Sequence, residues 1–252
     1  MSMGGFGRLQ KFSYVMNTLT QGAAAFFIYA LVFLEKHPVY ECQDTDDSWF
    51  ECDREHFCAS NSKMIWRVDW QNINSIHNFI EQLNFYCKPD YMMGLVGAFF
   101  LLGIVIGCST LTRLGDVYGR KPIYILGLFM HLSFMFGILI SRNPYVDYFL
   151  LFTFGMSITA RYYVGYTYNV EMQPKSHYVL VSTTMFLFES VVYLFITFYF
   201  RFISRRWQYL QIPNVLLTLM GIGFLFSMPE SPRFLISRHR FREAREVFTW
   251  IG

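Results

Sequence analysis

Residues 91–122 read YMMGLVGAFFLLGIVIGCSTLTRLGDVYGRKP, and this stretch decides the fold class. Its first part, residues 91–111, carries no charged side chain. An α-helix rises about 1.5 Å per residue, so a run of this length crosses the roughly 30 Å hydrocarbon core of a bilayer. A short segment rich in glycine and charge follows, and another apolar run begins at Pro122. The stretch therefore predicts a membrane-crossing helix and a tight turn into the next one.

Apolar runs of similar length recur on both sides of this stretch. They predict six transmembrane helices, at residues 14–34, 91–111, 122–140, 145–168, 178–200 and 207–228. Only 15% of the chain is charged, against about 25% in soluble domains. We expect an all-α membrane protein, a six-transmembrane-helix bundle in contact with membrane lipid. The net charge of +3 is too balanced for a nucleic-acid-binding protein.

Lysine and arginine in the short connections set the orientation, because they resist translocation. One side carries Arg8, Lys11, Arg113, Arg120, Lys121, Lys175, Arg233, Arg238, Arg240, Arg242 and Arg245, and the other only Arg142, Arg201, Arg205 and Arg206. We therefore expect both termini on the cytosolic or matrix side. The chain divides into an N-terminus with the first span (1–34), an outer-side polar loop (35–90), spans two to six (91–228) and an inner-side amphipathic tail (229–252).

The outer-side loop contains four cysteines, Cys42, Cys52, Cys58 and Cys87. Cysteines on the outer side favour disulfides in an oxidising space, and four cysteines allow three pairings. A zinc site is the alternative, because three histidines share the loop, although no Cys-x-x-Cys spacing supports it. The loop has no Asn-x-Ser/Thr glycosylation acceptor, which slightly favours an organelle membrane, such as the mitochondrial inner membrane, over the plasma membrane.

The turn at residues 112–122 also carries a family signature. It resembles the loop between spans two and three of the major facilitator superfamily at Asp116, Gly119, Arg120 and Lys121. Two positions depart from the family pattern: Thr112 stands where glycine is usual, and Val117 stands where arginine or lysine is usual.

A second motif follows the sixth predicted helix. Residues 229–235 read PESPRFL, which resembles the closing motif of sugar-porter and organic-cation-type members of that superfamily. The end of the fourth helix is similar to the same members at Tyr168, Glu171 and Pro174, whereas Leu151 stands where sugar porters usually have arginine. The resemblance covers the whole chain, as the N-terminal six-span half of a family whose members usually have twelve spans.

Charged residues gather at the predicted inner ends of the helices. They are Asp116, Arg120, Lys121, Glu171, Glu230 and Arg233. The resemblance implies that they form an inner-gate charge network, which breaks and re-forms during alternating access. The other interpretation is that they orient the helices and cap their ends, each contributing little to stability.

Two charges lie near the middle of predicted spans. Arg161 is ten residues before Glu171, and Glu189 is eleven residues after Tyr178, so both sit at similar depth on consecutive antiparallel helices. An isolated charge at this depth costs at least about 2.5–3.5 kcal/mol. We therefore expect an Arg161–Glu189 pair, either as a coupling site for substrate or protons in a cavity or as a structural salt bridge between the spans.

Polar residues interrupt the first apolar run at Asn17, Thr20 and Gln21. The resemblance implies that they line the cavity, because the first span of the family borders the substrate path. In the second run, Gly103 and Gly107 predict close helix packing. The sequence has no nucleophile elbow, phosphate-binding loop or metal-ligand motif, so we expect no enzyme activity, no cofactor and no bound metal.

The resemblance implies transmembrane transport of a sugar or organic ion by alternating access, with this chain as the first half of the carrier. The partners are then a small-molecule solute and a second six-span half, from another copy or another chain. The alternative is a transporter-derived accessory subunit of a larger membrane-protein assembly, such as a respiratory-chain complex. The departures at Thr112, Val117 and Leu151 favour this alternative, and the intact charges at the span ends favour the carrier.

Overall fold

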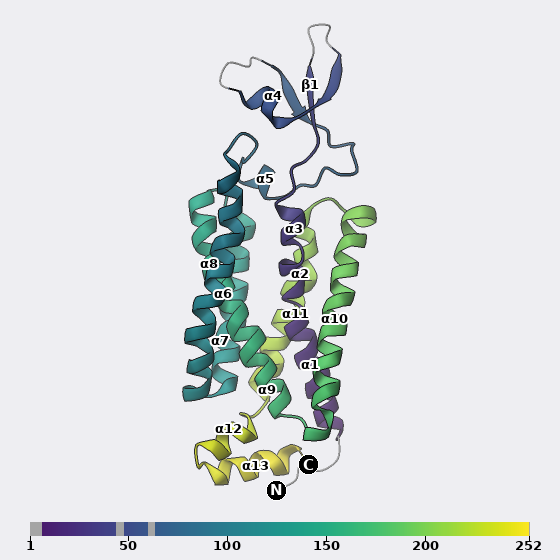
Figure 1. Cartoon of the computed structure of the whole chain (residues 1–252). Coiled ribbons are helices and arrows are strands. Elements are labelled where there is room, and N and C mark those ends of the chain that lie inside the picture. The colour runs from purple at the N-terminus through teal and green to yellow at the C-terminus, as the bar shows by residue number, and fades with distance from the viewer. Residues whose placement is uncertain (1–6, 44–47, 60–63, 252) are drawn as a thin grey trace.

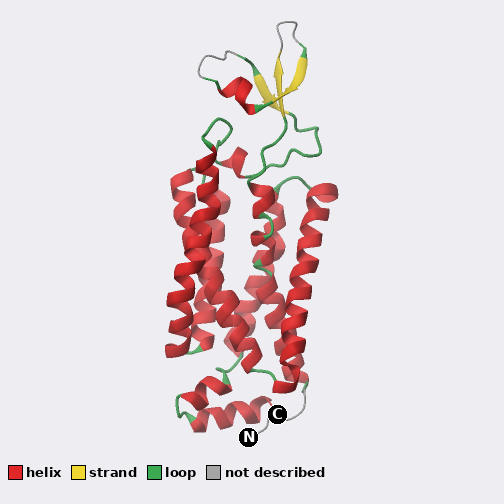
Figure 2. Cartoon of the chain, viewed as in Figure 1, coloured by secondary structure: helices red, strands yellow, loops and turns green. Residues whose placement is uncertain are grey.

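The computed structural model describes residues 7–43, 48–59 and 64–251. Long helices run side by side as a bundle, with a small disulfide-bonded domain at one end and two short helices at the other (Figure 1). The first helix begins, and the last helix lies, at the same end of the bundle, which we call the inner end (Figure 1). Nearly all secondary structure in the bundle is helical, as Figure 2 shows.

The bundle contains six helical stretches, several of them interrupted. They are built from α1 (Arg8–Gly22), α2 (Ala25–Ile28) and α3 (Leu31–Leu34); α6 (Asp90–Tyr118); α7 (Arg120–Ile140); α8 (Pro144–Thr159), η1 (Ala160–Val164) and α9 (Gly165–Glu171); η2 (Lys175–His177), α10 (Tyr178–Phe198) and η3 (Tyr199–Ile203); and α11 (Trp207–Ser227). The tail forms α12 (Pro232–Ser237) and α13 (Phe241–Ile251). These stretches correspond to the six predicted spans, and the predicted fold class is confirmed.

Five of the six stretches in the described residues are long and apolar enough to cross a membrane. The exception is the fourth, residues 144–171, whose hydropathy is lowered by the charges of Asp147 and Arg161 and by several tyrosines. A π-helical turn, η1, carries Arg161 in the middle of this stretch. Such turns are frequent at functional sites, because the extra residue alters which side chains face a neighbouring helix.

The second and fourth helical stretches pack backbone against backbone, as the glycines in the sequence predicted. A Cβ atom on Gly103 would lie 2.0 Å from the carbonyl oxygen of Phe152, and one on Gly155 would lie 2.2 Å from that of Phe100. Gly107 is similarly close to Thr159. Without side chains at these positions, α6 and α8 approach closely and gain van der Waals contact along the crossing.

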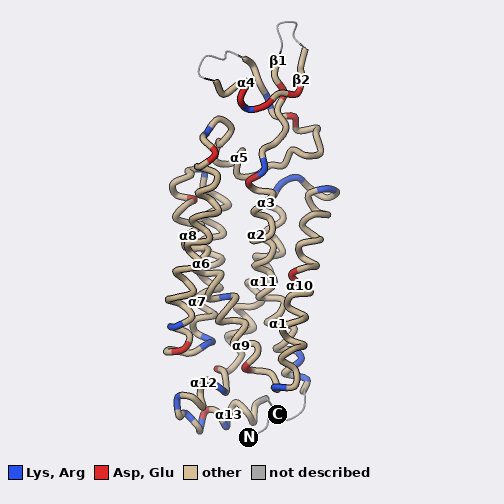
Figure 3. Tube along the Cα trace, viewed as in Figure 1, with Lys and Arg blue, Asp and Glu red and all other residues tan. Residues whose placement is uncertain are grey.

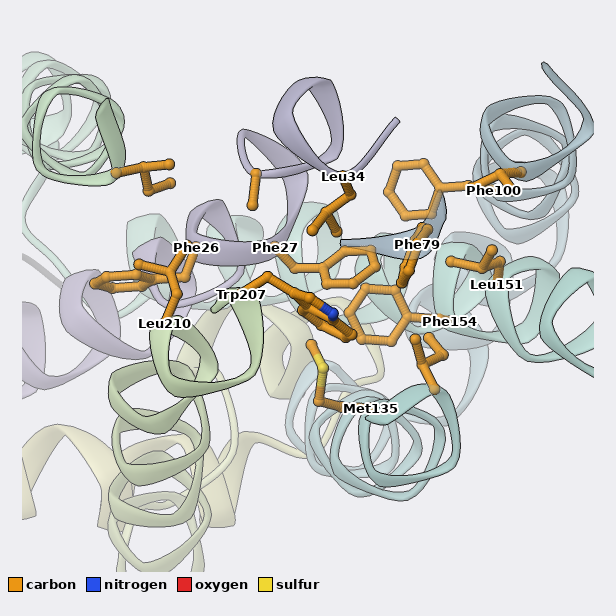
Figure 4. Close-up of a cluster of buried hydrophobic side chains, with 14 of the residues drawn as sticks. Phe26, Phe27, Leu34, Phe79, Phe100, Met135, Leu151, Phe154, Trp207 and Leu210 are labelled. Atoms are coloured by element: carbon orange, nitrogen blue, oxygen red, sulfur yellow. The ribbon is translucent and has the colours of Figure 1, made fainter. Parts of the chain in front are cut away.

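An aromatic cluster fills the bundle near its outer end (Figure 4). The rings of Phe27 and Phe154 lie 4.6 Å apart, and Trp207 is 5.2 Å from Phe79, which α5 (Phe79–Gln82) inserts from the outer loop. All four side chains are completely buried. Burying large rings stabilises the fold strongly, so this cluster fixes the outer ends of the helices to one another and to the outer loop.

The outer loop is a small domain rather than an irregular connection. Strands β1 (Tyr40–Gln43), β2 (Trp49–Cys52) and β3 (Trp66–Val68) form an antiparallel sheet in the order β2-β1-β3, beside α4 (Arg54–Cys58). Disulfides join Cys42 to Cys52 and Cys58 to Cys87. The disulfide prediction is therefore confirmed, and the structure selects one of the three pairings that the sequence left open.

Arg54 connects this outer domain to the bundle. Its Nη1 lies 2.7 Å from Oδ1 of Asp90, the first residue of α6, and 3.1 Å from Nε2 of His37, just after α3. Because arginine can only donate, Nε2 of His37 accepts and its Nδ1 carries the proton, which points to the hydroxyl of Tyr40 at 2.9 Å. This arrangement requires neutral His37, and burial, followed by the charge of Arg54, lowers the pKa of His37.

Acid is expected to weaken this connection. A histidine whose folded-state pKa is lowered contributes stability above its usual pKa, and this contribution is lost as the pH falls through the lowered value. When the pH is lowered from 7.5 to 5 in detergent, the Tm of His37→Gln should therefore fall less than the Tm of the natural protein. His56→Gln, at an exposed position of the same domain, is the control and should behave like the natural protein. Equal losses in all three proteins would contradict a role for His37.

Candidate functional site

Charged residues occur mainly at the two ends of the bundle, as Figure 3 shows. At the inner end, three segments distant in sequence meet: the turn between α6 and α7, the end of α9, and the segment between α11 and α12. These segments carry the residues for which the sequence predicted an inner-end charge network.

Arg120 is the centre of this network. Its Nη1 lies 2.6 Å from Oδ1 of Asp116 and its Nε lies 3.5 Å from Oε2 of Glu171, so it joins the second and fourth helical stretches. Nη1 also donates to the carbonyl oxygen of Gly115 at 2.8 Å. The side chains of Arg120 and Glu171 are only 16% and 12% exposed, whereas Asp116 is 68% exposed. The contact with Glu171 is therefore shielded from water, and the contact with Asp116 is not.

Glu230 binds backbone instead of a basic side chain. Its carboxylate accepts from the backbone N–H of Lys121 at 3.1 Å, in the first turn of α7, and from that of Ser231 at 2.8 Å. A helix N-terminus has free N–H groups and a partial positive charge, which favour a carboxylate there. Burial raises the pKa of Glu230, and the backbone N–H groups that it accepts from oppose the rise. This carboxylate attaches the start of α7 to the end of α11.

Gly119 is needed for this attachment. Its φ of +119° favours glycine, and a Cβ there would lie 2.4 Å from Oε2 of Glu230. The conformation of the turn and the position of the carboxylate therefore both require the glycine that the sequence motif contains.

The other two predicted members make different contacts. Lys121 donates through Nζ to the carbonyl oxygen of Met228, and Arg233 lies over the ring of Tyr178 at 5.0 Å. Neither forms an ion pair among the described residues. All six predicted residues thus lie at the inner end, but only Asp116, Arg120 and Glu171 pair as ions.

Sequence reasoning missed three further members of this site. Ser231 donates to Glu171, the hydroxyl of Tyr168 donates to the carbonyl oxygen of Pro229 at 2.8 Å, and Arg238 donates to the carbonyl oxygen of Asp116 at 2.8 Å. Tyr168 and Ser231 lie within the quoted motifs, so the motifs offered a signal. Arg238 was indistinguishable from the other arginines of the tail.

The predicted Arg161–Glu189 pair does not form. Both residues are buried, but none of the ion pairs among the described residues joins them. Arg161 points to α1, where its Nε donates to the carbonyl oxygen of Thr20 at 3.0 Å. Glu189 instead accepts from the hydroxyls of Tyr162 and, at 3.4 Å, Tyr29. The two side chains therefore bind different helices, Arg161 to α1 and Glu189 to tyrosines of the first and fourth helical stretches.

Glu189 borders a pocket between the first, second, fourth and fifth helical stretches. The pocket has a volume of about 210 Å³ and is lined by Ala25, Ile28, Tyr29, Ile104, Ile158, Tyr162, Tyr163 and Glu189. Glu189 is the one acidic residue of this lining, and its two tyrosine partners belong to the pocket wall. Tyr29 and Tyr162 could not be selected from the sequence, because the chain has 17 tyrosines.

The expected cavity-lining residues Asn17, Thr20 and Gln21 lie elsewhere. All three are buried within the bundle and are absent from the lining of this pocket. Asn17 donates to the carbonyl oxygen of Ser13, and the hydroxyl of Thr20 donates to that of Met16. They belong to the interior of the bundle, where the carbonyl oxygen of Thr20 also accepts from Arg161.

Among the described residues there is no group of three or more histidine, cysteine, aspartate or glutamate side chains that could hold a metal ion. The four cysteines of the outer domain instead form two disulfides, His37 binds Arg54 and Tyr40, and His77 binds Glu81.

Comparison with known proteins places these features in a family. The family model for "Sugar (and other) transporter" matches residues 10–252. An organic cation transporter-like protein of Drosophila melanogaster is 26% identical over 94% of this chain and 47% of its own length. Mouse solute carrier family 22 member 21 is 29% identical, and human organic cation/carnitine transporter 2 is 26% identical, each over 68% of this chain and about a third of its own length (30% and 31%). The chain thus spans half or less of the relatives that it matches, and it belongs to the sugar (and other) transporter family of the major facilitator superfamily.

Proposed function

We propose that this chain is the first half of a carrier that moves small organic cations across a membrane by alternating access. The observation that carries the proposal is the pocket at Glu189, where one buried carboxylate shares the lining with three tyrosines, Tyr29, Tyr162 and Tyr163. A carboxylate supplies the opposite charge, and aromatic faces attract cations by about 0.5–2 kcal/mol each. The names of the relatives, several of which are called organic cation transporters, support the same substrate class.

The inner-end contacts fit such a carrier. Arg120 joins the second and fourth helical stretches, and Glu230 attaches α7 to the end of α11, so together they close the inner end of this half. In our proposal these contacts hold one conformation of the carrier and separate in the other, with the substrate near mid-membrane. A second six-span half, from this protein or from a partner chain, would complete the path.

Transport can be tested in vesicles that contain the natural protein together with the second half of the carrier. We expect uptake of tetraethylammonium to exceed uptake of a neutral sugar, and Glu189→Gln to lower the cation uptake at least about tenfold, because the loss of one desolvated opposite charge is worth more than about 1.4 kcal/mol. Tyr162→Phe removes one of the hydroxyls that donate a hydrogen bond to Glu189, and it should have a smaller effect.

Glu55→Gln is the matched control, since Glu55 is an exposed glutamate of the outer domain and should leave uptake unchanged. Full cation uptake by a folded Glu189→Gln variant would refute the site. If folded natural protein moved neither solute, the carrier proposal would fail, and the accessory-subunit interpretation would replace it.

A further inference from the structure

Arg161 carries a buried charge that no acidic residue balances. Its side chain is 0% exposed, and its Nε and Nη2 both donate to one backbone oxygen, that of Thr20. Its Nη1 has no hydrogen-bond partner among the described residues. No carboxylate of the described residues forms an ion pair with Arg161, and Glu189 is bound by tyrosines instead.

Two further donors converge on the same place from other helices. A Cβ atom on Gly165, in the helical turn after Arg161, would lie 2.8 Å from Cζ of Tyr124 and 3.0 Å from Nε2 of Gln21. Tyr124 comes from α7, and Gln21 follows Thr20 on α1. The hydroxyl of Tyr124 and both amide atoms of Gln21 are buried without a partner. Three helices therefore place a guanidinium, a hydroxyl and an amide within about one helical turn of one another in the buried interior.

The amide oxygen of Gln21 can accept one hydrogen bond here, but it is neutral and does not balance the charge of Arg161. A buried donor that makes no hydrogen bond loses its interaction with water without replacement, and an uncompensated charge inside a membrane costs still more. Arginine does not escape this cost by losing its proton, because its side chain stays charged in proteins. Water could accept the hydrogen bonds, but water is neutral and leaves the positive charge uncompensated.

We propose that this site binds a small monovalent anion of the size of chloride. Arg161 supplies the opposite charge through Nη1, and Tyr124 and Gln21 supply neutral donors, so that the anion joins α1, α7 and the fourth helical stretch. Because the anion neutralises a buried charge, it stabilises the folded bundle. The inference does not depend on which solute the protein carries.

The test is the thermal stability of the natural protein in detergent, with sodium chloride exchanged for sodium gluconate at constant ionic strength. A ligand that binds only the folded state raises stability with its concentration. We expect Tm to rise by about 5 °C between 1 and 300 mM chloride. Tyr124→Phe should keep the response but shift it to about tenfold higher chloride, because one hydrogen bond to the anion is lost.

Arg161→Gln should abolish the chloride response, whereas Arg201→Gln and Tyr118→Phe, at exposed positions of the same residue types, should retain it. If Arg161→Gln does not fold, the shift in Tyr124→Phe and the anomalous signal of bromide in crystals of the natural protein still decide the question. The same Tm in chloride and gluconate, or bromide density away from Arg161, would overturn the proposal and leave the site to water.

Discussion

Valine in place of Gly103 should prevent the helices of this bundle from packing. The Cβ atom alone would lie 2.0 Å from the carbonyl oxygen of Phe152 and 3.2 Å from Cα of Gly155, and both atoms belong to the backbone of α8. Backbone cannot rotate away as a side chain can, so α6 and α8 would have to separate. Overpacking usually costs about 1–3 kcal/mol. We expect at least the upper end of this range here, because separating α6 from α8 would also loosen the contacts at Gly107 and Gly155.

Unfolding in mixed micelles of mild detergent and SDS measures this effect. The matched control is Gly94→Val on the same helix, where a Cβ atom meets nothing within 4 Å. Valine is a better helix former than glycine, so the control should be unchanged or slightly more stable. If both variants unfolded at the same SDS fraction, α6 and α8 would not be in backbone contact.

The sequence predicted the features that depend on composition and distance along the chain. Apolar runs located the spans, because the thickness of a bilayer fixes the length of a helix that crosses it. Residues 229–235 and the turn at 112–122 located the inner-end site, since turns between adjacent helices must lie at their ends. The paired glycines predicted a close helix crossing, because small residues allow backbones to approach closely.

The features that depend on direction around a helix could not be predicted. Arg161 and Glu189 were expected to pair because they lie on consecutive antiparallel helices, but Arg161 lies in a π-helical turn, and such a turn alters which side chains face a neighbouring helix. Their actual partners, Thr20 and the tyrosines, gave no signal in a chain that is 20% aromatic. The strands of the outer domain are only three or four residues long, which is too short for alternation of polar and apolar residues to reveal them.

Arg120→Gln should have the second largest effect on stability. Glu171 has two polar partners at the inner end, the guanidinium of Arg120 and the hydroxyl of Ser231, and its side chain is only 12% exposed. Removing the guanidinium leaves a carboxylate that is largely shielded from water and has lost its opposite charge. Breaking a fully buried pair in this way costs about 3–5 kcal/mol, and we expect about 2–3 kcal/mol here, because Arg120 keeps some contact with water.

Variants of the two ion pairs of Arg120, with Asp116 and with Glu171, show which pair causes this loss of stability. Asp116 lies only 2.6 Å from the guanidinium, but it is 68% exposed, so Asp116→Asn should cost less than about 1 kcal/mol. Arg113→Gln, at an exposed position on α6, the helix of Asp116, should cost about as little. A loss in Arg120→Gln no greater than in these two variants would show that the contact with Glu171 adds nothing to stability. The expected order, with Arg120→Gln well above both, would instead mean that shielding from water, and not the shorter distance, decides which ion pair holds the inner ends of the helices together.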